Sequence, residues 1–357
     1  MRRPLRFRSL AVVGLLLVAV TATACGSDGT DATSDDETTT TAEGTGSGTA
    51  GDGAFPVTID HAFGSVTIDE APKRVVSVGY TEQDVLLALD VTPVGVTDWY
   101  GDQPHATWPW AQDELGDAKP EVLSIADGFQ YEKIAALKPD LIVGTNAGME
   151  EDSYEKLSAI APTLAQKDGA EGYFSEWDDQ TLMIGRAVGK AAEAEDLVDG
   201  VKADFAAAAK AHPEWAGKQV VFLQNAFYEG NAIAYQDGLS TDFLTDLGFE
   251  VPKVLDDYVT EDGGQAYIPI EKLSVLDDAD LLIWGTEAPS DRGELEKEPL
   301  YRALEPVQDG HLVFTDGETA GAIYFTSVLS LPYVLDQLVP ALEQALGDGG
   351  PATIGGK

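Results

Sequence analysis

"YEKIAALKPDLIVGT" at residues 131–145 and "IEKLSVLDDADLLIWGT" at residues 270–286 repeat one pattern. Each stretch has Glu-Lys, a helical turn of apolar residues, an acidic residue, a short apolar run and Gly-Thr. Apolar residues three or four positions apart favour a helix, and a short apolar run closed by glycine predicts a strand buried on both faces. One helix–strand unit that occurs twice, 139 residues apart, predicts two similar lobes rather than an array of repeats.

Strands and helices alternate around both copies. In the first half, strands are expected on either side of "HAFG" (61–64), in 74–79 and in 91–99, with a helix that starts at Thr81. In the second half, strands are expected in 219–224 and 310–315, and helices in 239–248 and 326–346. Such alternation predicts parallel α/β packing in each half.

One long helix is expected between the halves, over about 177–211. The stretch is rich in Ala, Leu, Lys and Glu; Gly185 and Gly189 weaken it, and Pro213 ends it. The predicted organisation is therefore an N-terminal lobe at 54–175, an interlobe helix at 176–213, a C-terminal lobe at 214–347 and a flexible tail at 348–357.

The N-terminus predicts export. Residues 1–24 combine a basic start with an 11-residue apolar run, which is too short to span a bilayer and is typical of a secretory signal. Cys25 follows, and as the only cysteine of the chain it leaves no intramolecular disulfide. The surrounding sequence resembles a bacterial lipobox, with Ala22 where leucine is usual, which implies lipidation of Cys25; cleavage after Ala24 without a lipid is the alternative. Residues 25–53 then read as the lipid attachment point and a disordered linker, because Gly26 to Gly53 include no aromatic or large aliphatic residue.

Charge and motifs exclude several function classes. The formal net charge of −40 would repel nucleic acid and anionic lipid. The chain has no Gly-x-Ser-x-Gly, no phosphate-loop motif and no Cys-x-x-Cys or His-x-x-x-His, and its four histidines are scattered. An enzyme and a bare metal site are therefore disfavoured.

Three stretches resemble one family. They are "PKRVVSVGYTEQDVLLALDVTPVGV" (72–96), the first repeated unit, and "DGHLVFTDGETAGAIYFTSVLSLPYVLDQL" (309–338). All three are similar to ferric-siderophore-binding lipoproteins of bacterial ABC importers, a group that also holds haem- and cobalamin-binding members. The resemblance implies two Rossmann-like lobes joined by one long helix, with the ligand in a cleft between them.

The same resemblance implies the function. A monomer, anchored through Cys25 to the outer face of the cytoplasmic membrane, would capture a ferric siderophore and deliver it to an ABC permease and its ATPase. The siderophore is transported cargo, and no intrinsic cofactor is expected. Haem or cobalamin as the ligand remains the main alternative; a secreted enzyme and an interaction module without a transporter are lesser ones.

Candidate ligand contacts lie where predicted strands end, because ligands of open α/β lobes bind outside the carboxyl ends of the strands. Aromatic, amide and basic residues recur there, with Trp108 and Trp110 close behind, whereas Trp284 falls inside a strand and Arg186 is expected to form a surface ion pair. The candidates are Tyr80, Trp99, Tyr100, Asn146, Asn225, Tyr228, Tyr267, Arg292, Tyr324 and Phe325.

The chelate class stays open. A siderophore already fills the coordination shell of iron, so the protein needs flat apolar surface, hydrogen bonds, and positive charge where the complex is anionic. Hydroxamate binders of the group place an arginine before the first repeated unit, and that position aligns with Ala126 here.

Docking to the permease is implied by the cobalamin-binding relatives, which use one acid on each lobe. The matching positions are Asp84, with Glu82 as a neighbouring candidate, and Glu271 in the second repeated unit. Glu132 in the first unit is then the structural counterpart of Glu271 and not a docking acid.

Overall fold

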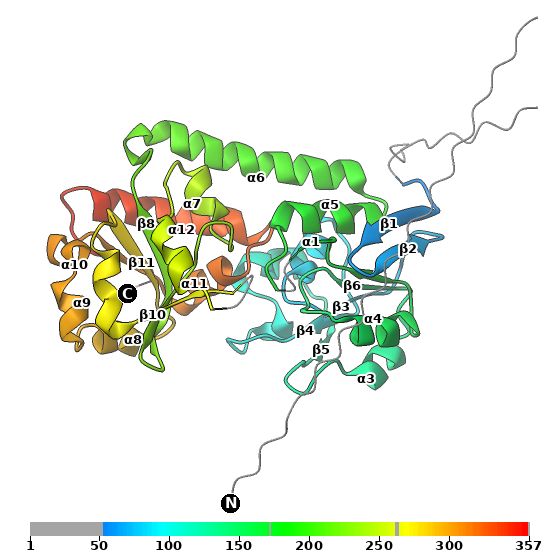
Figure 1. The fold of residues 1–357 in the computed structure, drawn as a ribbon. Helices are drawn as coiled ribbons and strands as arrows, with labels where there is room; N and C mark the ends of the chain where they lie inside the picture. The colour runs from blue at the N-terminus through cyan, green and yellow to red at the C-terminus, as the bar shows by residue number, and fades with distance from the viewer. Residues whose placement is uncertain (1–52, 171–172, 261–263, 356–357) are drawn as a thin grey trace, which may run out of the picture. The chain divides into compact units, whose positions relative to one another are not determined.

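The computed structural model describes residues 53–170, 173–260 and 264–355. The expected signal, Cys25 and the linker up to residue 52 lie outside the described residues. Two parallel sheets organise the described chain, with helices packed around them (Figure 1). The α/β class with two lobes is confirmed.

The first lobe opens with the expected hairpin, whose strands β1 and β2 pair antiparallel. Its sheet has five parallel strands in the order β5-β4-β3-β6-β7. The elements are β1 (Val57–His61), β2 (Gly64–Ile68), β3 (Val75–Ser77), α1 (Glu82–Ala88), β4 (Gly95–Thr97), η1 (Pro104–Ala106), η2 (Pro109–Ala111), α2 (Gln112–Leu115), β5 (Glu121–Leu123), α3 (Tyr131–Ala136), β6 (Leu141–Gly144), α4 (Glu151–Ser158), β7 (Thr163–Ala165) and α5 (Trp177–Ala187).

The second lobe is built on six strands in the order β10-β9-β8-β11-β12-β13. Strands β8, β11, β12 and β13 run parallel, and β9 and β10 add an antiparallel edge. The elements are η3 (Pro213–Trp215), β8 (Val220–Tyr228), β9 (Asn231–Ala234), α7 (Asp242–Asp246), η4 (Lys253–Tyr258), β10 (Ala266–Pro269), η5 (Ile270–Leu276), β11 (Leu281–Gly285), α8 (Pro289–Leu295), α9 (Pro299–Ala303), α10 (Glu305–Asp309), β12 (Leu312–Phe314), α11 (Gly317–Tyr324), α12 (Ser330–Leu346) and β13 (Ala352–Thr353).

The repeated unit has a structural cause that is the same in both lobes. Asp140 stands before β6 and accepts the backbone N–H of Arg74 at 2.7 Å, next to the start of β3. Asp280 stands before β11 and accepts the backbone N–H of Gln219 at 2.7 Å, next to the start of β8. Each aspartate therefore satisfies a donor at the start of the neighbouring central strand, which would otherwise lack a partner.

The glycine of each unit makes room for a neighbour at the end of its strand. A Cβ at Gly144 would lie 2.5 Å from Cε of Met149, and one at Gly285 would lie 3.0 Å from the ring of Phe222. The helices of the two units differ, because α3 is an α-helix and η5 is a 3₁₀ helix.

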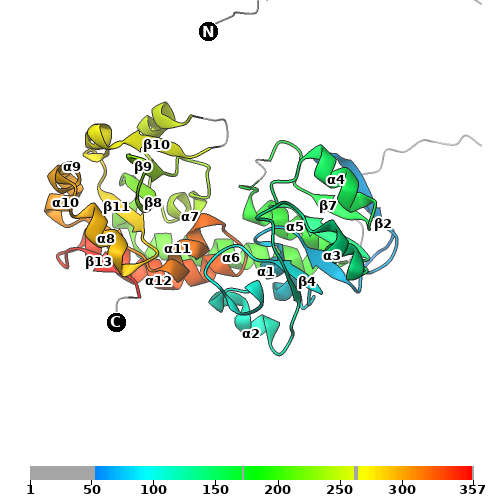
Figure 2. The ribbon, with the colours of Figure 1, turned by 90° about the horizontal axis from the view of Figure 1, so that it is seen from below.

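The expected single interlobe helix is wrong in one respect: the stretch forms two helices. α5 ends at Ala187, and α6 (Ala191–Ala211) starts after a break at Gly189, which has a φ of +75°. α5 packs on α1 and β1 of the first lobe, and α6 packs on α5 and then on α7 and α12 of the second (Figure 1). In Figure 2, α6 is seen between the group that holds β4 and β7 and the group that holds β8 and β9. The connector between the lobes is therefore α6 alone.

The expected flexible tail is also corrected, as far as residue 355. Ala352 and Thr353 form β13, which pairs in parallel with β12. The backbone N–H of Ile354 donates to the carbonyl of Phe314 at 2.8 Å, and the Ile354 side chain is buried. The tail completes the second sheet.

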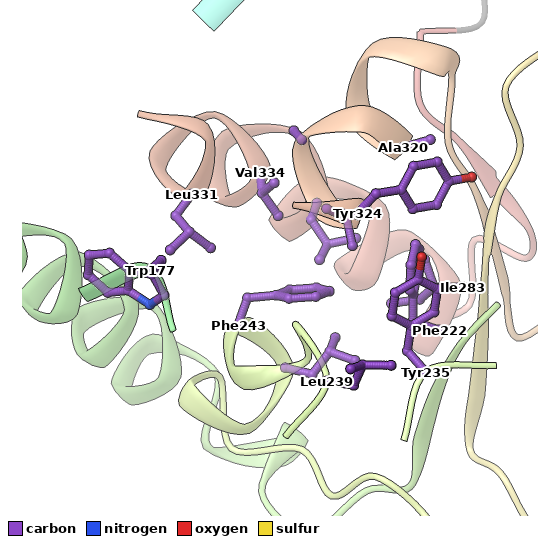
Figure 3. Packing of buried hydrophobic residues seen from close by; sticks show 14 of the residues in the cluster. Trp177, Phe222, Tyr235, Leu239, Phe243, Ile283, Ala320, Tyr324, Leu331 and Val334 are labelled. Carbon is purple, nitrogen blue, oxygen red and sulfur yellow. The ribbon is translucent and has the colours of Figure 1, made fainter. Parts of the chain in front are cut away.

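Most buried apolar side chains belong to one cluster that draws on both sheets. Figure 3 shows part of it, with Phe222, Tyr235 and Tyr324 grouped beside Ile283 of β11. Across residues 53–355, the masked positions aside, no helix combines the length and the apolar character needed to cross a membrane.

Candidate functional site

Aromatic residues from the carboxyl ends of both sheets meet each other. Tyr80 follows β3 and Trp99 follows β4, whereas Phe325 follows α11 in the other lobe. The ring centroids of Trp99 and Phe325 are 4.7 Å apart, and those of Tyr80 and Phe325 are 5.3 Å apart. The Tyr100 hydroxyl donates to the carbonyl of Gly317 at 3.1 Å. The structure therefore brings together Tyr80, Trp99, Tyr100, Tyr324 and Phe325, five of the predicted contacts.

Four further aromatic residues complete this group, and strand-end reasoning did not select them as contacts. Trp108 lies 5.0 Å from Tyr100, Tyr173 stacks on Tyr80 at 5.6 Å, Phe174 lies 5.6 Å from Phe325, and Tyr235 stacks on Tyr324 at 6.2 Å. Trp108 fell close behind a predicted strand end, which is the one sequence signal among the four. The interlobe aromatic cluster comprises Tyr80, Trp99, Tyr100, Trp108, Tyr173, Phe174, Tyr235, Tyr324 and Phe325.

The cluster has a buried base and an accessible rim. Trp108, Tyr235 and Tyr324 are buried. Tyr80, Trp99, Tyr100, Phe174 and Phe325 are partly exposed, and Tyr173 is 39% exposed. A small glycine allows the close approach of the lobes: a Cβ at Gly321 of α11 would lie 2.6 Å from the Trp108 ring and 2.9 Å from the Tyr100 hydroxyl. The partly exposed rings of the rim come from both lobes.

Four phenols of the cluster, those of Tyr80, Tyr100, Tyr235 and Tyr324, stay protonated. Burial raises the pKa of Tyr80 to about 12, with smaller contributions from Tyr173 and Glu82. Burial also raises the pKa of Tyr100, Tyr235 and Tyr324. These residues therefore act as neutral hydrogen-bond donors and aromatic faces at physiological pH.

Glu82 is fully buried beneath Tyr80. Its carboxylate accepts the backbone N–H groups of Thr81 at 3.1 Å and Asn146 at 2.6 Å. Burial raises the pKa of Glu82 to about 7, against the lowering effect of those hydrogen bonds. Glu82 thus ties the loop after β3 to the loop after β6 and fixes the backbone that carries Tyr80.

The structure contradicts the prediction that Asp84 docks to the permease. Only 3% of the residue is exposed, and one carboxylate oxygen accepts from Trp110 Nε1 at 2.8 Å and from the Ser327 hydroxyl at 2.5 Å. Its other oxygen has no partner in the described part of the chain. Burial raises the pKa of Asp84 to about 6. A docking acid must be reachable from outside, so the assignment of Asp84, and of the equally buried Glu82, to permease docking is wrong.

Glu287 follows the second Gly-Thr and is the acid that the second lobe brings to the cluster. The Tyr324 hydroxyl lies 3.0 Å from the Glu287 carboxylate and 2.8 Å from the carbonyl of Gly285, and it can donate to either. Glu287 is partly buried, and this burial raises the pKa of its carboxyl group. Its place directly after the repeated unit is the signal that could have identified it.

Three other predicted contacts lie on the antiparallel edge of the second sheet. β8 has a bulge between Gln224 and Phe227, where Asn225 has a φ of +52°. A small pocket of about 160 Å³ beside it is lined by Gln224, Asn225, Ala226, Phe227, Tyr228 and Ile233. Tyr228 is 58% exposed. Tyr267 in β10 pairs with Ile233 in β9. The edge adjoins the cluster, because the Tyr235 hydroxyl donates to Gln224 Oε1 at 3.4 Å.

The side chains of the remaining two predicted contacts are engaged elsewhere. Asn146 is buried, and its Oδ1 accepts the backbone N–H of Ser175 at 3.3 Å. Arg292 pairs with Glu296 at 2.7 Å, stacks over Phe314 at 4.5 Å and reaches Thr353 in the edge strand β13. Arg292 is therefore directed toward the far edge of the sheet rather than toward the aromatic cluster.

The structure also places Trp284 and Arg186, which the sequence analysis did not assign to the ligand site. Trp284 is fully buried, as expected. Arg186 donates to the carbonyl of Thr58 at 3.2 Å, and within the described ranges it does not form the expected ion pair. In the ranges that the structure describes, no three His, Cys, Asp or Glu residues are grouped so that they could hold a metal ion.

Comparisons with known proteins agree with this fold. The sequence profile described as periplasmic binding protein matches residues 75–319. The "Probable siderophore-binding lipoprotein YfiY" of Bacillus subtilis is 30% identical over 79% of this chain and 86% of its own length.

Two solved structures are similar. A periplasmic solute binding protein from Mycobacterium smegmatis is 46% identical, with a TM-score of 0.76 over 82% of this chain and 99% of its own. Streptococcus pneumoniae PiaA in complex with ferrichrome is 26% identical, with a TM-score of 0.69 over 81% and 98%. With two sheet-based lobes joined by α6 and a profile match over most of its length, the chain belongs to the periplasmic binding protein family.

Proposed function

We propose that the protein is the extracytoplasmic substrate-binding lipoprotein of an ABC importer, that it captures a ferric siderophore, and that it catalyses no reaction. The observation that carries this proposal is the interlobe aromatic cluster, since it offers partly exposed aromatic faces from both lobes to one ligand. The siderophore-binding name of YfiY and the ferrichrome complex of PiaA support the ligand class.

The cluster suits a molecule that brings its own metal ligands. A ferric siderophore encloses its iron in oxygen donors, so the protein has to recognise an outer surface of flat, partly apolar groups. Trp99 and Phe325 supply apolar area from the two lobes, and Tyr80 supplies a hydroxyl donor beside Trp99 on the same rim. Asn225, Tyr228 and Tyr267 on the β8–β10 edge are proposed to extend this surface.

Docking is proposed at the repeated units. Glu271 of η5 is exposed beside a shallow pocket of about 110 Å³, and Leu300 at its rim is 44% exposed. Glu132 of α3 is exposed at the equivalent place of the first unit. With Asp84 buried, Glu132 is the acid of the first lobe that matches Glu271. Cys25 would hold the loaded protein, as a monomer, near the permease and its ATPase.

Tryptophan fluorescence tests the ligand class. The secreted chain without residues 1–25 is titrated with ferric trihydroxamate, ferric catecholate, ferric dicitrate, haem and cobalamin. We expect saturable quenching by at least one ferric chelate, because Trp99 and Trp108 lie in the cluster. Strong quenching by haem or cobalamin alone would contradict the proposal.

Two tryptophan variants test whether the quenched fluorescence comes from the aromatic cluster. Trp99→Phe should remove much of the quenching and weaken binding. Trp215→Phe should leave both unchanged, because Trp215 is buried against His212 and Phe249 in the second lobe. Equal loss in both variants would place the ligand elsewhere.

A further inference from the structure

We propose that this site selects a ferric chelate of zero or positive net charge and rejects anionic chelates. The inference rests on the proposed function and narrows it to one substrate class. The carboxyl groups of Glu82, Asp84 and Glu287 lie at or next to the aromatic cluster, and none of them pairs with a lysine or arginine among the described residues.

Glu82 and Asp84 belong to α1 of the first lobe, and Glu287 follows β11 of the second. Glu82 lies two residues after Tyr80, and its charge contributes to the raised pKa of the Tyr80 phenol. Glu287 lies 3.0 Å from the Tyr324 hydroxyl. Asp84 accepts from Trp110, whose ring stacks on Trp108 at 5.0 Å. None of the three acids forms a salt bridge with any residue that the structure describes.

The charged side chains that raise the pKa of Tyr100, Tyr235 and Tyr324 are all acidic. The charged groups that act on the Tyr100 hydroxyl are Glu287 and Asp316, and Glu287 also acts on Tyr324 and Tyr235. By contrast, Tyr301, outside the cluster, senses the positive charge of Arg292. The electrostatic environment of the cluster is therefore negative.

The lysines and arginines that form salt bridges in the described residues pair with acids outside the aromatic cluster. Their salt bridges are Lys156–Asp152, Lys167–Asp179, Lys202–Asp178, Lys218–Asp280, Arg292–Glu296 and Lys297–Glu294, and none of these residues belongs to the cluster. Arg186 binds the carbonyl of Thr58. The two arginines that could have bound an anionic chelate, Arg186 and Arg292, are thus both committed to other contacts.

The net charge of a ferric chelate decides whether these carboxyl groups attract it or repel it. Three hydroxamates balance the charge of a ferric ion, whereas three catecholates leave three excess negative charges. Aromatic faces carry negative potential and attract cations, and carboxylates in a half-buried site do the same more strongly. A neutral trihydroxamate, or one with an ammonium group, fits the cluster, and a tris-catecholate is repelled.

A series with one iron-binding scaffold and three charges tests the inference. Ferrioxamine B has a free amine and carries one positive charge, its N-acetyl form is neutral, and its N-succinyl form carries one negative charge. Affinities for the full secreted chain are measured by fluorescence at low salt. We expect affinity about tenfold lower for the succinyl than for the acetyl form, as for unit charges roughly 10 Å apart near a protein surface. Equal or tighter binding of the succinyl form would overturn the inference.

Variants at matched charge identify the source of the selectivity. Glu287→Gln keeps an acceptor for Tyr324 and removes the charge, and it should reduce the ratio of acetyl to succinyl affinity at least threefold, on the order of the interaction with one carboxylate. Glu250→Gln makes the same change of net charge at the opposite, amino-terminal end of β8 and should leave the ratio unchanged. An unchanged ratio in Glu287→Gln would contradict the assignment.

The wild-type protein provides a check that needs no variant. Raising the salt concentration should bring the affinities of the acetyl and succinyl forms together, because mobile ions screen the carboxylates. A ratio that does not respond to salt would count against a charge effect.

Failure of the inference is distinguishable from failure of the proposed function. Tight binding of ferric catecholate or ferric dicitrate, with no binding of the trihydroxamates, would keep the siderophore function and overturn the charge selectivity. Binding of no ferric chelate at all would overturn both.

Discussion

The carboxyl group of Asp84 lies at the seam between the lobes, where it joins Trp110 of the first lobe to Ser327 before α12 of the second. A buried carboxylate with one unpartnered oxygen costs free energy when it is ionised. The group is therefore both a link between the lobes and a source of pH-dependent stability.

We expect the protein to be more stable at mildly acidic than at mildly basic pH. The pKa is raised to about 6 for Asp84 and to about 7 for Glu82, so each exceeds its value in the unfolded chain. Their contribution to stability is fully present below the unfolded pKa of about 4 and is lost as the pH rises through about 6 to 7. Thermal unfolding measured between about pH 5 and about pH 8 checks this expectation.

Asp84→Asn separates this effect from the general repulsion of an acidic protein. The variant should flatten the pH dependence by about 1–3 kcal/mol, as for a shift of one to two pKa units. Asp196→Asn, on the exposed side of α6, makes the same charge change and should keep the slope of the wild type. A slope that Asp84→Asn leaves intact would show that Asp84 does not titrate in this range.

At the residue scale, strand ends alone selected residues that the structure brings together. The carboxyl ends of parallel strands gather at one sheet edge, so Tyr80, Trp99 and Tyr100 could be selected from strand ends alone. Asp84 could not be judged in the same way, because its burial depends on Ser327, which is 243 residues away in the chain. Tyr235 was missed because it follows β9, an antiparallel strand between β8 and β10 that the sequence analysis did not predict.

At the scale of elements, the break between α5 and α6 decides which segment joins the lobes. Residues that favour a helix stand on both sides of Gly189, so propensity alone predicts one helix. The break follows from packing: a Cβ at Gly189 would lie 2.7 Å from the ring of Phe55, and the backbone there has the left-handed conformation that favours glycine. β13 was missed for a related reason, since a two-residue strand exists only through its partner β12.

Two glycine substitutions with opposite outcomes test the break. Gly189→Ala should lower the free energy of unfolding by about 1 kcal/mol or more, because it combines an unfavourable φ with a clash at Phe55. Gly200→Ala, in the middle of α6 with open space around its Cα, should raise it by about 0.5–1 kcal/mol. Chemical denaturation of both variants gives the comparison, and stabilisation by Gly189→Ala would show that the helices can merge.

At the scale of the whole molecule, we propose different surfaces for ligand capture and for delivery. Capture is proposed at the aromatic cluster, where contacts such as Trp99–Phe325 cross between the lobes. Delivery is proposed at exposed acids on α3 and η5, the helices of the two repeated units. The two functions should therefore be separable by mutation.

Charge reversal tests this separation. Glu132→Lys and Glu271→Lys should each reduce iron uptake into cells by about tenfold, comparable to the loss of a charge pair at an interface, while chelate affinity of the purified protein stays unchanged. Glu193→Lys, exposed on α6, is the matched control and should support normal uptake. Normal uptake in the double variant Glu132→Lys/Glu271→Lys would exclude docking through these acids.

Because α6 starts after the break at Gly189, a small tilt at its first turn would displace its far end by several ångström. Its 21 residues give a length of about 31 Å at 1.5 Å per residue. A tilt of about 5° at its first turn would move its far end by about 3 Å, which is typical of small hinge motions between rigid bodies. That displacement is comparable to the 4.7 Å between the rings of Trp99 and Phe325. A tilt of that size would change the separation of the aromatic faces without breaking any hydrogen bond within α6.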